Sequence, residues 1–449
     1  MSDLFEKSIL TLELPRVLEQ LSQQAVTEEG RERCLALRPF TDADDVGRAL
    51  RETTAAVDLI SLRGSPSFTG VKPVAGSLQR AEMGGSLNTR ELLDVAAVLR
   101  CARGCIDYYN GSDKATPLDP LFRGLTASRG LEEKITTSIL SEEEIADAAS
   151  PELADIRRHK RSTAGKVREI LQRLLSSNQS KYLQESIITQ RNGRYVVPVK
   201  SEFKNEVPGL VHDLSASGGT FFIEPMGVVK ANNELRELEA KEKKEIERIL
   251  AELSAECAAH REDISQDYDF IIMLDVIFAK AGLSLHLGGM APAIVQKGLR
   301  FERARHPLLD RDTAVKNDLW LGEGFDTLVI TGPNTGGKTV TLKTMGLLVL
   351  MAQCGLHIPA AGESRMRVFR RVLADIGDEQ SIAQSLSTFS SHMTNIVGIL
   401  GETDDDTLVL FDELGAGTDP VEGAALAAAV IEEARSLGAL VCATTTTPS

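Results

Sequence analysis

Residues 332–339 read Gly332-Pro333-Asn334-Thr335-Gly336-Gly337-Lys338-Thr339, and this octet decides the fold expected for the last third of the chain. It fits the phosphate-binding pattern of a glycine, four residues and then Gly-Lys-Ser/Thr. The apolar run at 328–330 is typical of a buried strand, and residues 340–350 have the spacing of an amphipathic helix. The sequence therefore predicts a strand, a phosphate loop and a helix in succession.

Each part of this octet has a physical role in binding ATP and Mg²⁺. The glycines let the loop wrap closely, so backbone N–H groups can face phosphate oxygens, and the helix N-terminus favours an anion. We expect Lys338 to reach the β- and γ-phosphates and the Thr339 hydroxyl to ligate Mg²⁺. The alternative is a glycine-rich turn between strand and helix that binds no ligand.

A second candidate element is the apolar run at 407–411, which ends in Asp412 and Glu413. An acid at the end of a buried parallel strand beside a phosphate loop can hold hydrated Mg²⁺, and Asp412 has that position. The next carboxylate, Glu413, can orient or deprotonate the attacking water. The alternative is two solvated acids at a strand end. Beside the phosphate loop, the pair predicts an ATPase in which Lys338 and Glu413 are catalytic.

Three stretches resemble the MutS family of DNA-mismatch-repair ATPases. They are TGPNTGGKT at 331–339, SLSTFSSHM at 385–393 and DELGAGTDP at 412–420. In that family the middle stretch crosses a dimer interface to the neighbour's γ-phosphate, and Ser387 is the matching position. The resemblance therefore implies a homodimer in which Ser387 binds the nucleotide in trans. Taken locally, a Ser/Thr-rich stretch before a helix is more often an N-cap.

The resemblance is closest to the bacterial type-two branch of the family, over essentially the whole chain. Only 331 residues precede the phosphate loop, which leaves no room for both a mismatch-reading and a connector domain. The branch implies an ATP-driven clamp on branched or structured DNA. It also implies suppression of homologous recombination, rescue of collided ribosomes with rRNA contact, and a C-terminal Smr nuclease domain in full members. The segments 304–307 and 315–318 match family segments that flank the nucleotide.

The chain ends in Thr446-Thr447-Pro448-Ser449 where the family continues with a histidine and a tyrosine after Thr445. Deleting one C from codons for TTHYAEL gives TTTTPS, so a one-nucleotide frameshift is one hypothesis and a native short form is the other. On either account we expect the given chain to lack that histidine, the last ATPase helices and the nuclease domain. The alternative function is therefore a non-hydrolysing fragment that binds nucleotide and partner chains only.

The expected fold is mixed: a mainly α-helical core with long helical arms and a small β clamp, then an α/β P-loop ATPase domain of the ABC-like kind. We assign 1–152 with 251–297 to the helical core and lever, 153–250 to the arms and clamp, and 298–449 to the ATPase. The arms are expected as antiparallel helices at about 152–183 and 229–263, from their helical spacing. Between them, the Asn192-Gly193 turn and apolar runs from 186 to 223 predict a small sheet.

Charge is distributed unevenly along the chain. The net charge of −15 argues against a generally basic nucleic-acid coat, yet residues 157–204 contain twelve Lys or Arg and three Glu. Such a patch can bind a phosphate backbone without reading sequence. The candidate contacts are Arg191, Arg194, Lys200 and Lys204. The alternative is a solvated face of a long helix, and these residues do not decide between DNA and structured RNA.

Six cysteines show no paired metal spacing, and we expect Cys101 and Cys105 to be buried on one face of a helix at 93–109. No signal peptide or 18-residue apolar span is expected. Together these features predict a cytoplasmic protein that has no membrane partner. The resemblance implies a bacterial protein that is associated with the nucleoid or the ribosome.

Overall fold

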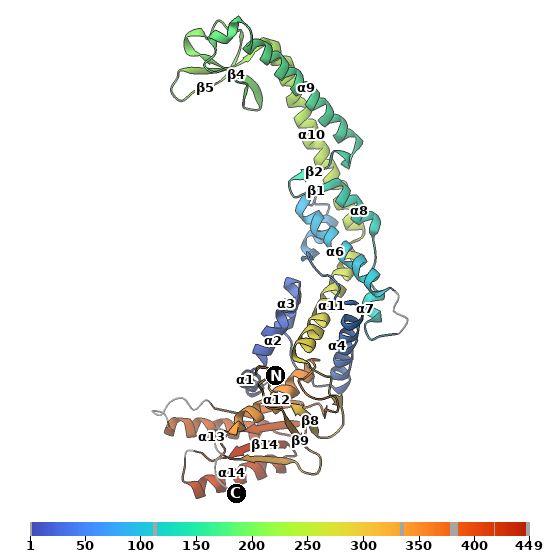
Figure 1. The fold of residues 1–449 in the computed structure, drawn as a ribbon, viewed down its shortest axis with the longest axis vertical. Helices are drawn as coiled ribbons and strands as arrows, with labels where there is room; N and C mark the ends of the chain where they lie inside the picture. Colours follow the sequence, from blue (N-terminus) through green and yellow to red (C-terminus); the bar gives the residue numbers. More distant parts are fainter. Residues whose placement is uncertain (1, 111–114, 333–335, 378–384, 417, 446–449) are drawn as a thin grey trace. The chain divides into compact units, whose positions relative to one another are not determined.

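The computed structural model describes residues 2–110, 115–332, 336–377, 385–416 and 418–445, with the backbone alone for 385–389 (Figure 1). It contains both α-helices and β-strands, as expected. The α-helices are α1 (Asp3–Thr11), α2 (Leu14–Ser22), α3 (Glu28–Leu35), α4 (Ala43–Arg63), α5 (Ala75–Glu82), α6 (Thr89–Tyr109), α7 (Asp119–Arg123), α8 (Arg129–Ser138), α9 (Pro151–Leu175), α10 (Met226–Ala259), α11 (Arg261–Leu287), α12 (Lys338–Gln353), α13 (Ser385–Glu402) and α14 (Pro420–Ser436). The strands are β1 (Ile139–Ser141), β2 (Glu144–Ile145), β3 (Thr189–Arg191), β4 (Arg194–Lys200), β5 (Gly209–Leu214), β6 (Thr220–Pro225), β7 (Ala293–Ile294), β8 (Leu299–Ala304), β9 (Asn317–Leu321), β10 (Thr327–Thr331), β11 (Arg365–Met366), β12 (Arg371–Asp375), β13 (Thr407–Phe411) and β14 (Leu440–Thr445).

The chain folds into two compact units. The first comprises Met1–Lys72, Cys101–Thr126 and Gln266–Ser449, and the second comprises Pro73–Arg100 and Ala127–Ser265. The three-part division expected from the sequence stays a prediction.

A parallel four-stranded sheet in the first unit positions the candidate site. Its strand order is β10-β14-β13-β12, and every neighbouring pair is parallel. Strand β13 begins and ends with the apolar run at 407–411. The strand predicted at 328–330 is confirmed, but it is only partly buried, because β10 lies at the edge of this sheet and Val329 is 44% exposed. Since β14 separates β10 from β13, the carboxyl end of β14 lies between the phosphate loop and Asp412.

Helix α12 follows the phosphate loop and packs against β13 and β14. It is buried on nearly all sides from Leu342 to Gln353. The helix expected at 340–350 therefore forms, but the expectation that it is amphipathic is wrong. The physical reason is that α2 and α4 also contact this helix. Gly346 allows the close approach, because a Cβ there would lie 2.4 Å from the Leu410 side chain. In Figure 1, α12 and α14 lie on either side of β14.

Helix α11 contains a window long and apolar enough to cross a membrane by length and composition, so the expectation of no 18-residue apolar span is wrong. In this structure 72% of that window is buried, as in the core helix of a globular unit. The expected burial of Cys101 and Cys105 in a helix is confirmed, since both lie in α6 and are at most 7% exposed.

In the second unit, helices α9 and α10 lie side by side (Figure 1). Helix α9 ends at Leu175, eight residues before the predicted end, because a 3₁₀ turn, η2 (Asn178–Tyr182), follows it. The Ser177 side chain accepts a hydrogen bond from Gln179 N and so caps that turn. The paired helices therefore form, but the first is shorter than its apolar spacing indicated.

Strands β3–β6 form an antiparallel sheet in the order β3-β4-β6-β5, called the β tip below. The predicted turn is confirmed: Asn192 and Gly193 have φ of 53° and 71°, and Arg191 pairs with Arg194 across it. Val197, Val199 and Ile223 are fully buried in its core, packed against apolar residues of α9 and α10. Strand β5 begins at Gly209, directly after Pro208, which cannot donate to a strand ladder.

Candidate functional site

The phosphate loop joins β10 to α12. Gly332 has a φ of 142° and Gly337, the N-cap of α12, a φ of 76°, which are conformations that favour glycine. Among the described residues, no side chain caps α12, so its first N–H groups suit an anion. Gly336 and Thr339 are described with this loop, whereas Pro333, Asn334 and Thr335 lie outside the described residues.

Lys338 is the first residue of α12 and is only 4% exposed. Its Nζ donates to the carbonyl oxygens of Gly332, at 2.6 Å, and Thr445, at 3.1 Å. The ammonium is therefore held between the carboxyl ends of two adjacent strands, β10 and β14. This is the place expected for a lysine that reaches a phosphate lying over the loop.

Asp412 and Glu413 follow β13 directly. Asp412 is 7% exposed, and its backbone N–H donates to the Asp375 carbonyl oxygen at 2.9 Å. Glu413 has a φ of 49°, a strained conformation for a non-glycine residue that persists only where its surroundings impose it. Such strain is concentrated at functional sites, which fits the role expected for Glu413.

Thr444 on β14 joins these two residues, and the sequence did not single it out as a site residue. Its hydroxyl donates to Asp412 Oδ1 at 2.5 Å and accepts from Glu413 N at 2.8 Å. Thr444 is fully buried. No motif spacing gives the strand order, so only the insertion of β14 between β10 and β13 reveals the contact. The available signal was a threonine one residue before the end of the run at 440–445.

A histidine from the SLSTFSSHM stretch also reaches this edge of the sheet. His392 on α13 shares a hydrogen bond of 2.8 Å between its Nδ1 and Asp375 Oδ2, and Asn395 Nδ2 donates to Asp375 Oδ1 at 2.7 Å. This hydrogen bond to the carboxylate raises the pKa of His392. The contacts fix α13 to the end of β12. Ser387 lies on the same helix, but its side chain is outside the described residues.

These groups fit a nucleoside triphosphate with Mg²⁺. Thr339 and Asp412 supply oxygen donors, which Mg²⁺ prefers, and Lys338 with the α12 N-terminus suits phosphate. Among the described residues no group of three His, Cys, Asp or Glu forms a dedicated metal cage. Mg²⁺ in phosphoryl-transfer sites is held by one or two protein groups plus phosphates, so the donor set suits that arrangement.

At the β tip, Arg194 is held inside the fold. Its Nη1 donates to both oxygens of Glu224 at 2.7 and 2.9 Å, and Glu224 is fully buried. Asn232 and His212 hydrogen-bond the same carboxylate. The Arg194 side chain is 15% exposed. The charge of Arg194 therefore already neutralises the buried carboxylate of Glu224. We correct the expectation that Arg194 contacts phosphate: its role is to hold Glu224 in position.

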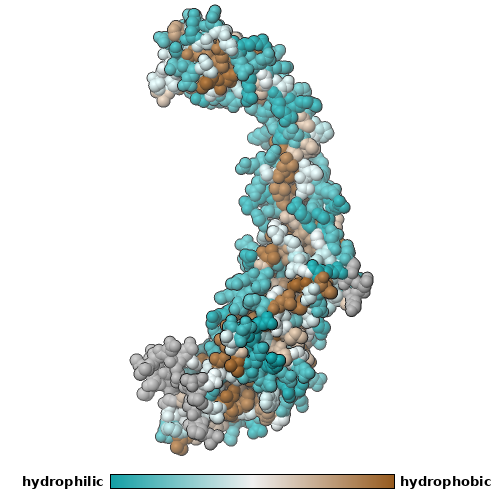
Figure 2. All heavy atoms as spheres, in the orientation of Figure 1, coloured by the Kyte–Doolittle hydropathy of each residue, from teal (hydrophilic) through white to brown (hydrophobic). Residues whose placement is uncertain are grey.

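Two of the other three predicted contacts, Arg191 and Lys204, lie over aromatic rings of the β tip. The Arg191 guanidinium lies 4.1 Å from the Phe222 ring centre and 3.4 Å from Asp213. Lys204 is exposed, with Nζ 4.7 Å from the Phe221 ring centre, and Lys200 Nζ donates to the Lys181 carbonyl oxygen at 3.4 Å. Figure 2 shows hydrophobic atoms exposed beside hydrophilic ones at this sheet. Aromatic rings beside cations suit nucleic-acid binding.

Along α9, acids neutralise much of the basic run. Arg157 pairs with Asp147 and Glu242, and Lys160 pairs with Glu242, at 2.7 to 2.8 Å. Arg161 pairs with Asp147 at 3.1 Å. Both acids lie outside the window 157–204, so a charge count along the sequence overstated the patch. The cations suited to an external phosphate are therefore those of the β tip rather than those of the arm.

Comparison with known proteins places these elements in one family. The family described as MutS domain V matches residues 328–446, which contain the parallel sheet and the candidate site. The chain is 50% identical to "Endonuclease MutS2" of Acetivibrio thermocellus over 98% of the chain and 56% of the relative. It is 49% identical to the protein of that name from Geobacillus thermodenitrificans over 99% of the chain and 57% of the relative.

The chain thus spans a little over half the length of the curated relatives that it matches. The likeness covers nearly all of the chain, from the N-terminal helices through the β tip to β14. The resemblance drawn from three short stretches is confirmed, and the chain belongs to the MutS family.

Proposed function

We propose that this chain is an ATP-binding and ATP-hydrolysing dimeric clamp, built on an ABC-like P-loop ATPase domain, that binds branched or structured DNA without reading mismatches. The observation that carries the proposal is the meeting of three motifs at one sheet edge. Lys338 contacts the backbone of Thr445, and Asp412 accepts a hydrogen bond from the neighbouring Thr444. A phosphate loop and a carboxylate pair joined in this way match the needs of phosphoryl transfer to water.

In this proposal the chain's own groups bind, orient and accept a proton. Lys338 exchanges its carbonyl contacts for phosphate oxygens, and the loop N–H groups around Gly336 and Gly337 add donors. Mg²⁺, held through Thr339 and Asp412, supplies charge neutralisation between the phosphates. Glu413 orients water and accepts its proton, with its backbone fixed by Thr444. Thr444 acts through Asp412 and Glu413 and is a positioning residue.

The nucleic-acid partner is proposed to contact the β tip. Arg191 and Lys204 offer cations beside aromatic rings, an arrangement that attracts phosphate and stacks bases without sequence preference. Lys200 adds a third cation on β4. Arg194 supports them by holding Glu224. A ribosome with its rRNA is the second proposed partner, since charge and stacking alone do not distinguish it from structured DNA.

We further propose a homodimer in which Ser387 binds the neighbour's nucleotide in trans. Nucleotide binding is then coupled to the binding of nucleic acid by the clamp. The proposed roles are suppression of homologous recombination and rescue of collided ribosomes, in the bacterial cytoplasm at the nucleoid or the ribosome, away from membranes. We do not assign the relatives' endonuclease activity to residues 1–449.

The test is ATP turnover by residues 1–449, with and without a four-way DNA junction or ribosomes. We expect Mg²⁺-dependent turnover that a nucleic-acid partner stimulates, and loss of turnover in Lys338→Ala. The matched control is Lys343→Ala, on the same helix. Nucleotide binding without turnover would favour the alternative, a non-hydrolysing fragment. Wild-type nucleotide affinity in Lys338→Ala would remove the phosphate-loop assignment.

A further inference from the structure

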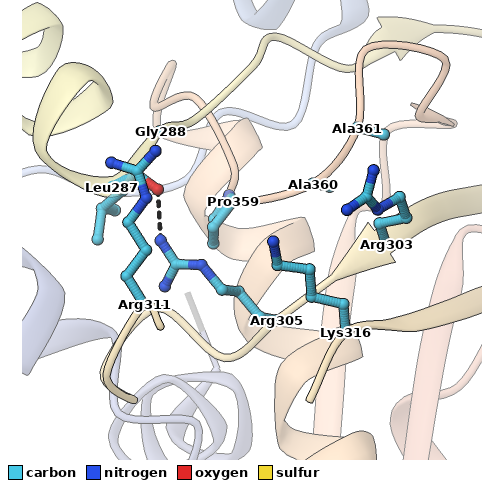
Figure 3. Close-up of a pocket in the computed structure, with 9 residues that line it drawn as sticks. All are labelled: Leu287, Gly288, Arg303, Arg305, Arg311, Lys316, Pro359, Ala360 and Ala361. Atoms are coloured by element: carbon cyan, nitrogen blue, oxygen red, sulfur yellow. Dashed lines mark hydrogen bonds between the residues drawn. The ribbon is translucent and has the colours of Figure 1, made fainter. Parts of the chain in front are cut away.

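A cavity of about 190 Å³ in the first unit is lined by four cationic side chains (Figure 3). Arg303 lies on β8, Arg305 directly follows that strand, and the other two lie on the loop that leads to β9. The lining residues are Leu287, Gly288, Arg303, Arg305, Arg311, Lys316, Pro359, Ala360 and Ala361. The described residues of the phosphate loop, Asp412 and Glu413 do not line this cavity. Arg305 and Lys316, however, belong to the segments 304–307 and 315–318 that the family resemblance places beside the nucleotide.

The walls of the cavity are fixed by the backbone. Arg305 is 5% exposed, its guanidinium donates to the Leu287 carbonyl oxygen, and its N–H donates to the Pro359 carbonyl oxygen at 3.1 Å. Gly288 has a φ of 60°, and a Cβ there would lie 3.0 Å from Arg311 Nη2. Arg303 has a φ of 48°, a strained conformation that its surroundings must hold. The Arg305 side chain is therefore placed by the fold, whereas Arg303, Arg311 and Lys316 are exposed.

Their charge is not balanced by ion pairs. Within the residues that the structure describes, no carboxylate lies within 4.0 Å of the charged groups of these four side chains. Asp310 and Asp312 act on Arg305 only at longer range. Burial, together with the charge of Arg311, lowers the pKa of Arg305. Burying a cation beside like charges is unfavourable unless an anion compensates it.

We propose that this cavity binds a multiply charged phosphate anion of about diphosphate size. Guanidinium forks match phosphate oxygens in pairs, and Lys316 adds a point charge. The cavity volume of about 190 Å³ leaves room for a small phosphate anion such as diphosphate. The anion is either free or the diphosphate group of a nucleotide whose remainder lies outside.

The test uses residues 1–449 carrying Lys338→Ala, so that the phosphate loop does not contribute, and titrates inorganic pyrophosphate by calorimetry. Adding Arg311→Gln and Lys316→Gln, both exposed, should weaken binding by about tenfold or more, since each removes a charge-assisted contact. The matched control adds Lys297→Gln and Arg370→Gln, which make the same charge change on exposed residues outside the cavity. It should keep the affinity within about twofold.

Equal pyrophosphate affinities in the two sets of variants, or no binding by a folded Lys338→Ala chain, would overturn the proposal. Arg305 is left intact because it is buried, and circular dichroism verifies folding. ADP that competes with pyrophosphate identifies a nucleotide as the source of the diphosphate, and absence of competition identifies a free polyphosphate. Either result supports the proposal that the cavity binds a phosphate anion. Because Lys338 is already replaced, the outcome is independent of whether the wild-type chain hydrolyses ATP.

Discussion

The Thr444 hydroxyl donates to Asp412 Oδ1 at 2.5 Å and joins the carboxyl ends of β14 and β13. The Thr444 hydroxyl oxygen also accepts from Glu413 N. The carbonyl oxygen of the next residue, Thr445, accepts from Lys338 Nζ. One strand end therefore contacts the phosphate-loop lysine, the proposed metal ligand Asp412 and the proposed base Glu413.

Thr444→Val removes the hydroxyl while nearly keeping the side chain's shape. It leaves a buried carboxylate and the Glu413 N–H without this partner, so we expect a loss of about 1–3 kcal/mol in the free energy of unfolding. We also expect a higher Mg²⁺ concentration for half-maximal turnover. Thr444→Ser keeps the hydroxyl and should behave like the wild type in both measurements. Equal losses in the two variants would show that packing, rather than the hydrogen bonds, matters here.

Glu413→Gln keeps the size of the side chain but removes its basicity. We expect nucleotide affinity near that of the wild type and turnover lower by about 10²- to 10⁴-fold, the usual contribution of a general base. Single-turnover hydrolysis and a binding titration separate the two effects. Glu422→Gln, in the first turn of α14, is the matched control and should retain activity. Turnover at the wild-type rate in Glu413→Gln would show that another group is the general base.

Lys200→Gln with Lys204→Gln should weaken binding of a four-way DNA junction and lower its salt dependence. Each lost phosphate contact reduces the slope of log affinity against log salt by about 0.9 for duplex DNA. Arg158→Gln with Arg173→Gln makes the same charge change on α9, where both residues pair with acids of their own helix. That control should change the affinity little. If it weakens binding as much as the tip variants, the contact is spread along the arm.

The His392–Asp375 hydrogen bond predicts a pH-dependent stability. Because the folded-state pKa of His392 is raised from its usual 6.5, its contribution is full below about pH 6.5 and is lost as pH rises through the raised pKa. The difference in unfolding free energy between wild type and His392→Gln should therefore shrink from pH 5.5 toward pH 9, as read by denaturant titration.

His357 provides an internal comparison with the opposite sign. Burial lowers the pKa of His357, which contacts Ser284 and Thr54. Its contribution is present above the usual pKa and is lost as pH falls, so the His357→Gln difference should grow with pH. The same trend in both variants would contradict the assignment of His392 to a charged pair.

Local signals predicted the parts of the fold that depend on neighbouring residues. The Asn192-Gly193 turn, the small sheet that contains β4, and β13 were predicted by apolar spacing and turn chemistry. Strand order, by contrast, is a property of the whole sheet. The sequence therefore gave no sign that β10 is an edge strand or that Thr444 touches Asp412.

Charge and burial were predicted less well, for a related reason. Glu224 on β6 neutralises Arg194, and Asp147 with Glu242 neutralises cations of α9. These partners lie up to 85 residues away in sequence, so a window count cannot include them. The amphipathic helix expected after the phosphate loop is covered on its outer side by α2 and α4, which precede it by about 300 residues. The cationic cavity likewise gathers residues from three separated segments.

The most direct test of the central claim is the affinity of a four-way DNA junction for Glu413→Gln, measured with and without Mg²⁺-ATP. The variant should bind ATP without hydrolysing it. The two junction affinities therefore compare the ATP-bound state with the nucleotide-free state. We predict a difference of about fivefold or more, typical of coupled sites, and its loss when Lys338→Ala is added. Identical junction affinities with and without ATP, in protein that binds ATP, would contradict a nucleotide-controlled clamp.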